Sequence, residues 1–332
     1  MNAALERDGP GLLLRDILKD DPQVTAFATV VRRVNPDILV LQGVDYDHGQ
    51  VTLTALRDHI ADLGGPRFAH LFSRRPNTGM TTGLDMDGDG YLGQARDKQG
   101  YGWFAGQAGM AILSRYPFDI DGMHDFTALK WKDIPGALLP KSKGTPFPST
   151  AVQTVQRLSS VAHWAVPVVV SKERTLHILT FHATPPVFDG PEDRNGRRNH
   201  DEIRFWQLYL DGQFGQAPKT QFVLVGDANV DPTDGEGRRE GIQNLLADPR
   251  LQDPKPKRPV SRNANLLDAE RLDTVAWPDD GPGQLRVQYI LPSIDLDVQG
   301  AGVHWPPSAT PEAADAVAAG PHRMVWVDLA MP

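Results

Sequence analysis

The sequence contains no cysteine among its 332 residues. Disulfides, thiolate metal sites and cysteine nucleophiles are therefore excluded. It also lacks an apolar run near 18 residues, so we expect no membrane span, and it has no basic-then-apolar leader at its start. These absences fit a secreted or periplasmic protein whose signal is not in this chain, although cytoplasmic proteins can lack cysteine as well.

An excess of basic charge is also missing, because the formal net charge is −8. A broad basic footprint for duplex nucleic acid is therefore not expected. The 40% hydrophobic and 23% charged residues are ordinary for a globular protein. No fixed repeat and no linker of biased composition divides the chain, so we predict a single domain over residues 1–332.

Hydrophobic periodicity predicts an α/β protein. Residues 21–35 favour a helix, with Asp21 as its cap and Pro22 at its first position. A second helix is predicted near 52–63, and a third from Asn199, with Glu202 three residues on as in a capping box. The predicted strands are 37–42, 108–114, 165–170, 175–181, 222–226, 285–292 and 323–329.

Two long stretches, 73–107 and 119–160, lack clear periodicity and are rich in glycine, proline and polar residues. Loops of this length in a compact domain are usually functional or disordered. We therefore predict that these stretches form long loops rather than further layers of the fold.

Polar side chains stand at the ends of several predicted strands. Ligands of α/β sheets bind outside the carboxyl ends of strands. A carboxylate with a nearby amide can hold a hard cation or orient a water, and a histidine can donate to a phosphoryl oxygen or take a proton. Each residue alone has a plainer interpretation as a turn former or an ordinary histidine. The residues are Asp45, Asp47, His182, Asp227, Asn229, Asp231 and His322.

The ordered motifs resemble those of the endonuclease/exonuclease/phosphatase superfamily over nearly the whole chain. The matching segments are "PDILVLQGVDYD", "GMAILSRYP", "TFHATPP", "VLVGDANVDP", "RVQYILPS" and "HRMVWVDL". The segment "EDRNGRRNHDEIR" is similar to that of the bacterial, often exported branch. The resemblance implies a four-layer α/β sandwich, with two packed mixed β-sheets flanked by helices. It also implies cleavage of phosphoester bonds with a divalent metal, commonly magnesium.

The resemblance assigns roles to five residues. Asn2 matches an asparagine at the end of the first strand, which implies that most of that strand is missing from this chain and that Asn2 contacts substrate. His182 matches a histidine that contacts the phosphate. Asp227 and Asn229 match the pair that orients water and substrate, and His322 matches the catalytic histidine.

Three positions depart from the family pattern. Gly43 replaces a metal-binding glutamate, Gln288 replaces an aspartate before tyrosine, and Pro321 replaces an aspartate before the final histidine. Asp45 or Asp47 could return a carboxylate to the site for Mg²⁺ or Mn²⁺, with Asp231 as a further candidate. The alternative is that these aspartates cap the next turn.

A second candidate metal site lies in "GLDMDGDGYLGQARD". Asp85, Asp87 and Asp89, followed by Gly90, have the start of a calcium loop. The twelfth position is Arg96 rather than glutamate, so this is no EF-hand. We predict either a structural Ca²⁺ site or a solvated polar turn.

The segment 191–202 holds three arginines, whose forks suit phosphate. We predict that Arg194 contacts the substrate. The alternative is that these arginines are ordinary surface residues at the start of a helix. The sequence thus predicts a metal-assisted phosphoester hydrolase, a phosphodiesterase or a phosphatase, acting on a small or polar phosphoester. The alternative is a catalytically impaired relative that binds a phosphorylated ligand without cleaving it. The oligomeric state stays open.

Overall fold

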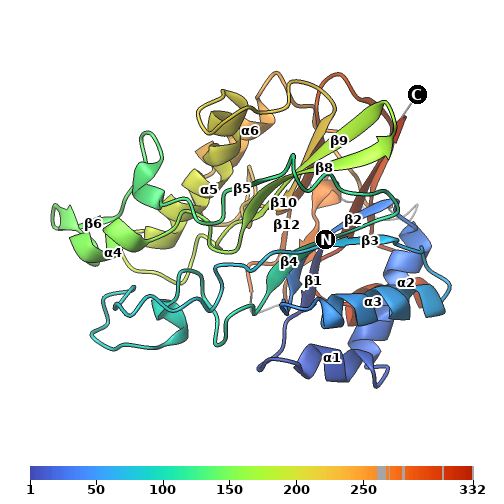
Figure 1. Ribbon diagram of the computed structural model, residues 1–332, viewed down its shortest axis with the longest axis horizontal. Helices are drawn as coiled ribbons and strands as arrows, with labels where there is room; N and C mark the ends of the chain where they lie inside the picture. The colour runs from blue at the N-terminus through green and yellow to red at the C-terminus, as the bar shows by residue number, and fades with distance from the viewer. Residues whose placement is uncertain (260–266, 269, 279–280, 309, 331–332) are drawn as a thin grey trace.

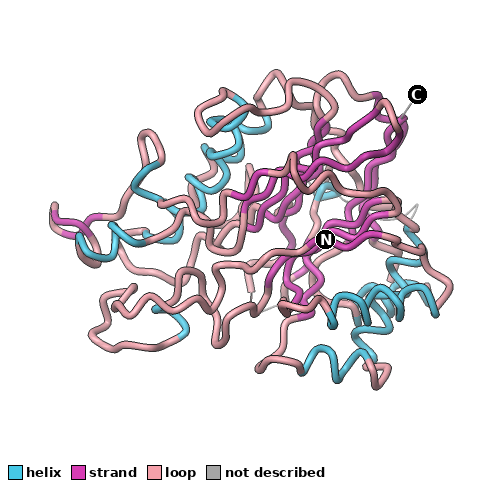
Figure 2. The backbone as a smooth tube through the Cα atoms, in the orientation of Figure 1, coloured by secondary structure: helices cyan, strands magenta, loops and turns pink. Residues whose placement is uncertain are grey.

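Two β-sheets pack face to face at the centre of the molecule (Figures 1 and 2). The computed structural model describes residues 1–332 apart from 260–266, 269, 279–280, 309 and 331–332. One sheet has the order β1 (Asn2–Leu5), β2 (Ile38–Val44), β4 (Gly109–Ser114) and β3 (His70–Phe72). The other has the order β13 (Gln288–Pro292), β10 (Phe222–Asp227), β9 (Arg174–His182), β8 (His163–Ser171) and β5 (His124–Asp125).

Both sheets are mixed. In the first, β1 is parallel and β4 antiparallel to β2. In the second, β10 is parallel to β9 and antiparallel to β13. The remaining pairs are β14 (Asp297–His304) with β15 (Met324–Ala330), β11 (Val275–Ala276) with β12 (Gln284–Leu285), and β6 (Lys141–Ser142) with β7 (Thr145–Pro146).

Helices cover the outer faces of the two sheets, which makes four layers (Figure 1). The helices beside the first sheet are α1 (Leu12–Ile17), α2 (Pro22–Val34), α3 (Val51–Asp62) and α7 (Pro311–Ala318). Those beside the second are α5 (Arg194–Leu210) and α6 (Glu240–Leu246), whereas α4 (Thr150–Val155) lies in the long loop region. Short 3₁₀ turns span Ala95–Asp97, Trp131–Asp133 and Glu270–Leu272. The predicted four-layer sandwich is confirmed.

Strand β2 shows how the sequence builds these layers. Leu39 and Leu41 pack in the cluster beneath the helices, whereas Val40 packs in the cluster between the sheets. Successive side chains of a strand point to opposite faces. A strand buried on both faces therefore needs the continuous apolar run that residues 37–42 carry.

The helix predicted over 21–35 is confirmed as α2. The Asp21 side chain accepts hydrogen bonds from the backbone N–H groups of Gln23 and Val24, and Pro22 occupies the first turn. The helix ends at Asn35, whose backbone is left-handed. Both ends of this helix therefore follow local rules that the sequence displays.

The predicted capping box at Asn199 and Glu202 is wrong. Helix α5 begins at Arg194, and both polar residues lie fully buried inside it. The Asn199 amide donates to the carbonyls of Thr184 and Ala228 instead of capping a helix end. Its partners are distant in sequence, so a local pattern cannot reveal them.

The strand predicted over 285–292 is interrupted. Arg286 and Val287 separate β12 from β13, because their N–H groups donate to Asp231 (2.6 Å) and to the Thr274 hydroxyl (3.0 Å). The first strand also differs from expectation, since Asn2 opens β1 rather than ending it. The long loops at 73–107 and 119–160 contain only short elements, as predicted. Within the described parts of the chain, no helix is long and apolar enough to cross a membrane.

Candidate active site

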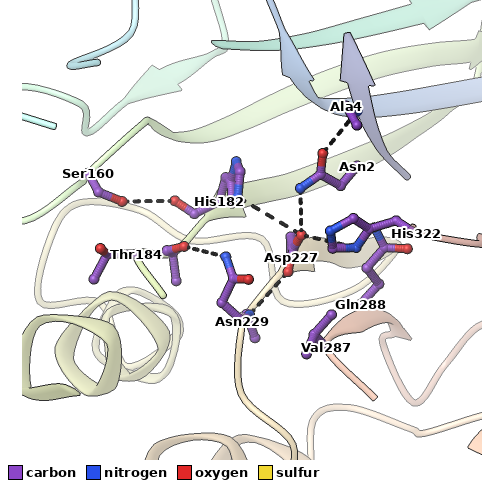
Figure 3. Close-up of polar contacts among 12 residues, drawn as sticks. Asn2, Ala4, Ser160, His182, Thr184, Asp227, Asn229, Val287, Gln288 and His322 are labelled. Carbon is purple, nitrogen blue, oxygen red and sulfur yellow. Dashed lines mark hydrogen bonds and ion pairs between the residues drawn. The ribbon is translucent and has the colours of Figure 1, made fainter. Parts of the chain in front are cut away.

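Three polar residues form a row at the end of the five-stranded sheet. His182 ends β9 and lies in register with Asp227, which ends the parallel strand β10. Gln288 opens the antiparallel strand β13 and pairs with Asp227 from the other side. The sheet register thus brings residues from three separate segments into one row (Figure 3).

His322 completes this group from the loop that leads into β15. Its Nδ1 lies 3.8 Å from Asp227 Oδ2, and His182 Nε2 lies 3.9 Å from the same oxygen. Asp227 is fully buried. Two imidazoles therefore flank one buried carboxylate oxygen, and we call His182, Asp227 and His322 the His–Asp–His centre.

The Asp227 carboxylate also accepts two short hydrogen bonds. The Asn2 side-chain amide donates to Oδ2 at 3.0 Å, and the backbone N–H of Asn229 donates to Oδ1 at 3.1 Å. Hydrogen bonds to a carboxylate stabilise its negative charge. Asn229 has a left-handed backbone (φ 51°), and its amide donates to the carbonyl of Ala183, the residue after His182. The four predicted catalytic residues and Asn2 thus lie together.

Burial sets the protonation of the two histidines. Desolvation lowers the pKa of His182 and lowers that of His322 to about 4, although the Asp227 charge opposes both shifts. Both rings are therefore neutral near pH 7. A neutral imidazole carries one donor and one acceptor nitrogen, so each ring can donate to an anion or accept a proton.

Gln288 takes the place of the expected aspartate and still contacts the histidine. With its amide oriented to satisfy both neighbours, the oxygen accepts from the backbone N–H of Asn2 at 2.6 Å and the nitrogen donates to the Arg323 carbonyl at 2.9 Å. His322 Nδ1 lies 3.3 Å from the same amide. A neutral group thus orients His322. Pro321 contributes only its carbonyl, which accepts from Ala276 N–H at 3.0 Å.

Gly43, at the expected glutamate position, has a left-handed backbone (φ 66°). A Cβ atom placed there would lie only 2.3 Å from Asn2 Oδ1. The Asn2 amide therefore fills the space that a side chain at position 43 would enter. The observed position of Asn2 therefore requires a residue without a side chain at position 43.

The carboxylates of Asp45 and Asp47 both accept from backbone N–H groups, but only Asp47 acts as a local cap. Asp45 accepts from the N–H groups of Arg7 and Ala108, at 2.9 and 3.0 Å, and burial raises its pKa to about 6. Asp47 accepts from the first two N–H groups of α3, at 2.8 and 2.9 Å. Asp231, the third candidate, likewise accepts from the N–H groups at 233 and 286. Within the described residues, neither Asp45 nor Asp47 joins Asp227 in a group of three metal-ligating side chains.

Asp85, Asp87 and Asp89 converge in the loop after β3, and we call them the acidic loop. Each offers a carboxylate oxygen, and these oxygens lie within 4.8 Å of one another. Asp85 also accepts from Gly90 N–H at 2.9 Å. Asp97 accepts from backbone N–H groups within the same loop. The three carboxylates therefore converge, and Ca²⁺ binding to them stays a prediction.

Arg194, the predicted substrate contact, lies against the acidic loop. Its guanidinium donates to the carbonyl of Met86, and the residue is half-buried. The contact joins the first turn of α5 to the loop, and the role in substrate binding stays a prediction.

Two functional residues escaped the sequence analysis. The Asn199 amide donates at 2.7 Å both to the carbonyl of Thr184, just after His182, and to that of Ala228, just after Asp227. Glu202, one turn further along α5, accepts from Thr184 N–H at 2.7 Å. Together they fix the two loops that carry the His–Asp–His centre. Their three-residue spacing on a helix is the available signal, and it is also the spacing of a capping box.

The sequence matches the model of the Endonuclease/Exonuclease/phosphatase family over residues 5–316. The chain belongs to this family. An endonuclease/exonuclease/phosphatase from Beutenbergia cavernae has a similar structure, with a TM-score of 0.55 and 18% identity over 99% of this chain and 69% of that one. A mannosyl-6-phosphatase from Bacteroides thetaiotaomicron has a TM-score of 0.51 and 14% identity over 98% and 96% of the two chains. No curated protein matches the chain.

Enzymes of this family use divalent metals. The residues around Asp227 do not fit such an ion well. They provide one carboxylate, both of whose oxygens accept N–H groups, and the position of the expected second carboxylate is Gly43. Mg²⁺ is usually held by one or two carboxylates together with waters and substrate phosphates, so this site offers the smallest carboxylate set, already engaged by two donors.

Proposed function

We propose that the protein hydrolyses a small or polar phosphoester at the His–Asp–His centre. The observation that carries this proposal is the convergence of His182 and His322 on one oxygen of Asp227, at 3.9 and 3.8 Å. Family membership supports the class of bond that is cleaved.

The geometry assigns a role to each residue of the centre. His322 has Nδ1 turned toward Gln288 and Asp227, which leaves Nε2 to take a proton from the attacking water. The water oxygen bonds to phosphorus, the ester P–O bond breaks, and the leaving alkoxide takes a proton from solvent, to which His322 then releases the proton that it accepted. His182 donates to a phosphoryl oxygen, and the Asp227 charge stabilises His322 while it is protonated.

Two observations support a small substrate. The net charge of −8 disfavours a long polyanion, whose binding depends on many phosphate contacts. The mannosyl-6-phosphatase is similar in fold only, but it illustrates that this architecture can accommodate a phosphatase. Monoester and diester remain alternatives that the assay separates.

The test uses p-nitrophenyl phosphate and bis-p-nitrophenyl phosphate, with and without added Mg²⁺ or Mn²⁺. We expect the wild-type protein to release nitrophenol from one of them and the His322→Ala variant to lose roughly 10²- to 10⁴-fold in rate. Equal release from both proteins would contradict the proposal for these substrates.

The departures at Gly43, Gln288 and Pro321 favour a second candidate, a relative that binds a phosphorylated ligand without cleaving it. Titration with inorganic phosphate, followed by ³¹P NMR, tests it. Saturable binding that His322→Ala weakens, together with no turnover of either ester, would select this candidate.

Two narrower proposals accompany this one. We propose a structural Ca²⁺ at the acidic loop, which calorimetric titration tests. The Mg²⁺ or Mn²⁺ site predicted at Asp45 and Asp47 draws no support from the contacts of these carboxylates. We also propose a secreted or periplasmic location, which fractionation of the source cells tests.

A further inference from the structure

The Asn2 side chain lies between Gly43 and the His–Asp–His centre. It fills the space that any side chain at position 43 would need in order to reach the centre. Its Oδ1 accepts from Ala4 N–H at 3.2 Å, and its Nδ2 donates to Asp227 at 3.0 Å. A Cβ at Gly43 would collide with this amide. A carboxylate at 43 and the observed Asn2 position therefore exclude one another.

The groups around Asp227 Oδ2 are an amide N–H donor and two imidazole rings rather than oxygen atoms that could bind a cation. Beside the Asn2 amide stand His182 Nε2 and His322 Nδ1, both within 4 Å. Glu6 is another nearby carboxylate whose charge acts on His182, and it is exposed to solvent. A hard cation prefers several oxygen ligands. The Asn2–Asp227 bond already occupies one of the lone pairs of Oδ2 that such a cation would use.

We propose that the His–Asp–His centre works without a divalent cation, and that the Asn2 amide takes over part of its role. The amide stabilises the negative charge of Asp227 by hydrogen bonding, without adding the positive charge of a cation. Neutral Gln288 stands beside His322 where the family pattern has an aspartate. Gly43, Gln288 and Pro321, the three departures from the family pattern, thus each remove a carboxylate, whereas Asn2 keeps the family residue.

This arrangement defines how a phosphate group is held. Without a bridging metal, its oxygens must be met by N–H donors, and His182 supplies one beside Asp227 while His322 accepts the proton of the attacking water. Such binding is insensitive to chelators. This proposal rests on the proposed function, because it concerns the same site. Metal binding tests it, however, so its failure can be distinguished from a failure of hydrolysis.

The experiment uses millimolar Mn²⁺ as a paramagnetic probe of the ¹⁵N-labelled protein. The imidazole resonances of His182 and His322 are followed by NMR. All proteins carry the substitutions Asp85→Asn, Asp87→Asn and Asp89→Asn, so that the acidic loop cannot hold the ion. We expect the wild-type centre to keep both resonances sharp.

The matched variant is Asn2→Asp, which exchanges one NH₂ group for an oxygen beside Asp227. We expect Mn²⁺ to broaden both imidazole resonances beyond detection in this variant, and circular dichroism checks that it folds. If Asn2→Asp does not fold, Pro321→Asp supplies the second carboxylate instead. Equal broadening in the wild type would overturn the inference.

A parallel assay keeps the two proposals distinguishable. Hydrolysis that depends on His322 and persists in EDTA supports both. Hydrolysis that requires added metal preserves the proposed function and overturns the cation-free centre. Absence of hydrolysis contradicts the proposed function, and the Mn²⁺ spectra then decide the inference alone.

Discussion

The acidic loop and the His–Asp–His centre are two carboxylate sites built in opposite ways. The acidic loop takes three aspartates from five consecutive residues, and all three are at least partly exposed. The centre takes one fully buried aspartate and surrounds it with residues from β1, β9 and the loop before β15. The first site is made by local sequence, and the second exists only in the folded chain.

The two sites are therefore suited to different tasks: the acidic loop to binding a cation, and the His–Asp–His centre to catalysis. In the acidic loop, several carboxylate oxygens converge, and a hard cation relieves their repulsion. At the centre, the single negative charge already has hydrogen-bond donors, so it can instead polarise two histidines. The predictions below perturb one of the two sites, or the contacts that hold it.

The largest effect is expected from Asp227→Ala. The change leaves the Asn2 amide and two imidazoles without their shared partner. We expect hydrolysis to fall by roughly 10³-fold, because both orientation and charge stabilisation are lost. The reference protein carries Asp85→Asn, Asp87→Asn and Asp89→Asn and should keep most of its rate. A similar loss in both would mean that the two sites are not separable.

Local sequence predicted the parts of the fold that depend on neighbouring residues. The apolar runs gave β2 and β10, and the Asp21–Pro22 pair gave the start of α2. The position of His182 and Asp227 at strand ends also followed, since ligands bind outside such ends. The order of the motifs then supplied the family resemblance and the four layers.

The remaining features depend on contacts between distant segments. Gly43 gives no hint that its neighbour in space is Asn2, and Gln288 gives none that it reaches His322. Polar residues inside a helix look like a cap when their partners lie far along the chain, as with Asn199. Such features follow from the sheet register, which one sequence does not display.

A second prediction concerns the Asn199 clamp. Asn199→Ala leaves two buried carbonyls without their donor, those of Thr184 and Ala228. We expect a loss of roughly 4 kcal/mol in the free energy of unfolding, measured by urea titration. Asn244→Ala, at an exposed position of α6, is the matched control and should change little. Equal effects at both positions would show that the buried bonds contribute nothing specific.

A third prediction uses the lowered pKa of His322, about 4 in the folded protein against 6.5 as its ordinary value. The unfolded chain binds this proton more readily, so stability contributed here is present above pH 6.5 and lost as pH falls toward 4. As the pH falls from 6.5 to 4, the free energy of unfolding should decrease by roughly 3 kcal/mol less in His322→Gln than in the wild type. Parallel stability curves for the two proteins would contradict the assignment.

The smallest effect is expected at the acidic loop. Binding of Ca²⁺ to the folded state alone should raise the free energy of unfolding by about 1.4 kcal/mol at roughly ten times the dissociation constant. Thermal unfolding with Ca²⁺ and with EDTA measures this, and Asp87→Asn should abolish the difference because Asp87 supplies one of the three converging carboxylates. If Ca²⁺ stabilises the wild type and Asp87→Asn equally, the cation binds elsewhere. The acidic loop would then not be the cation site that distinguishes it from the His–Asp–His centre.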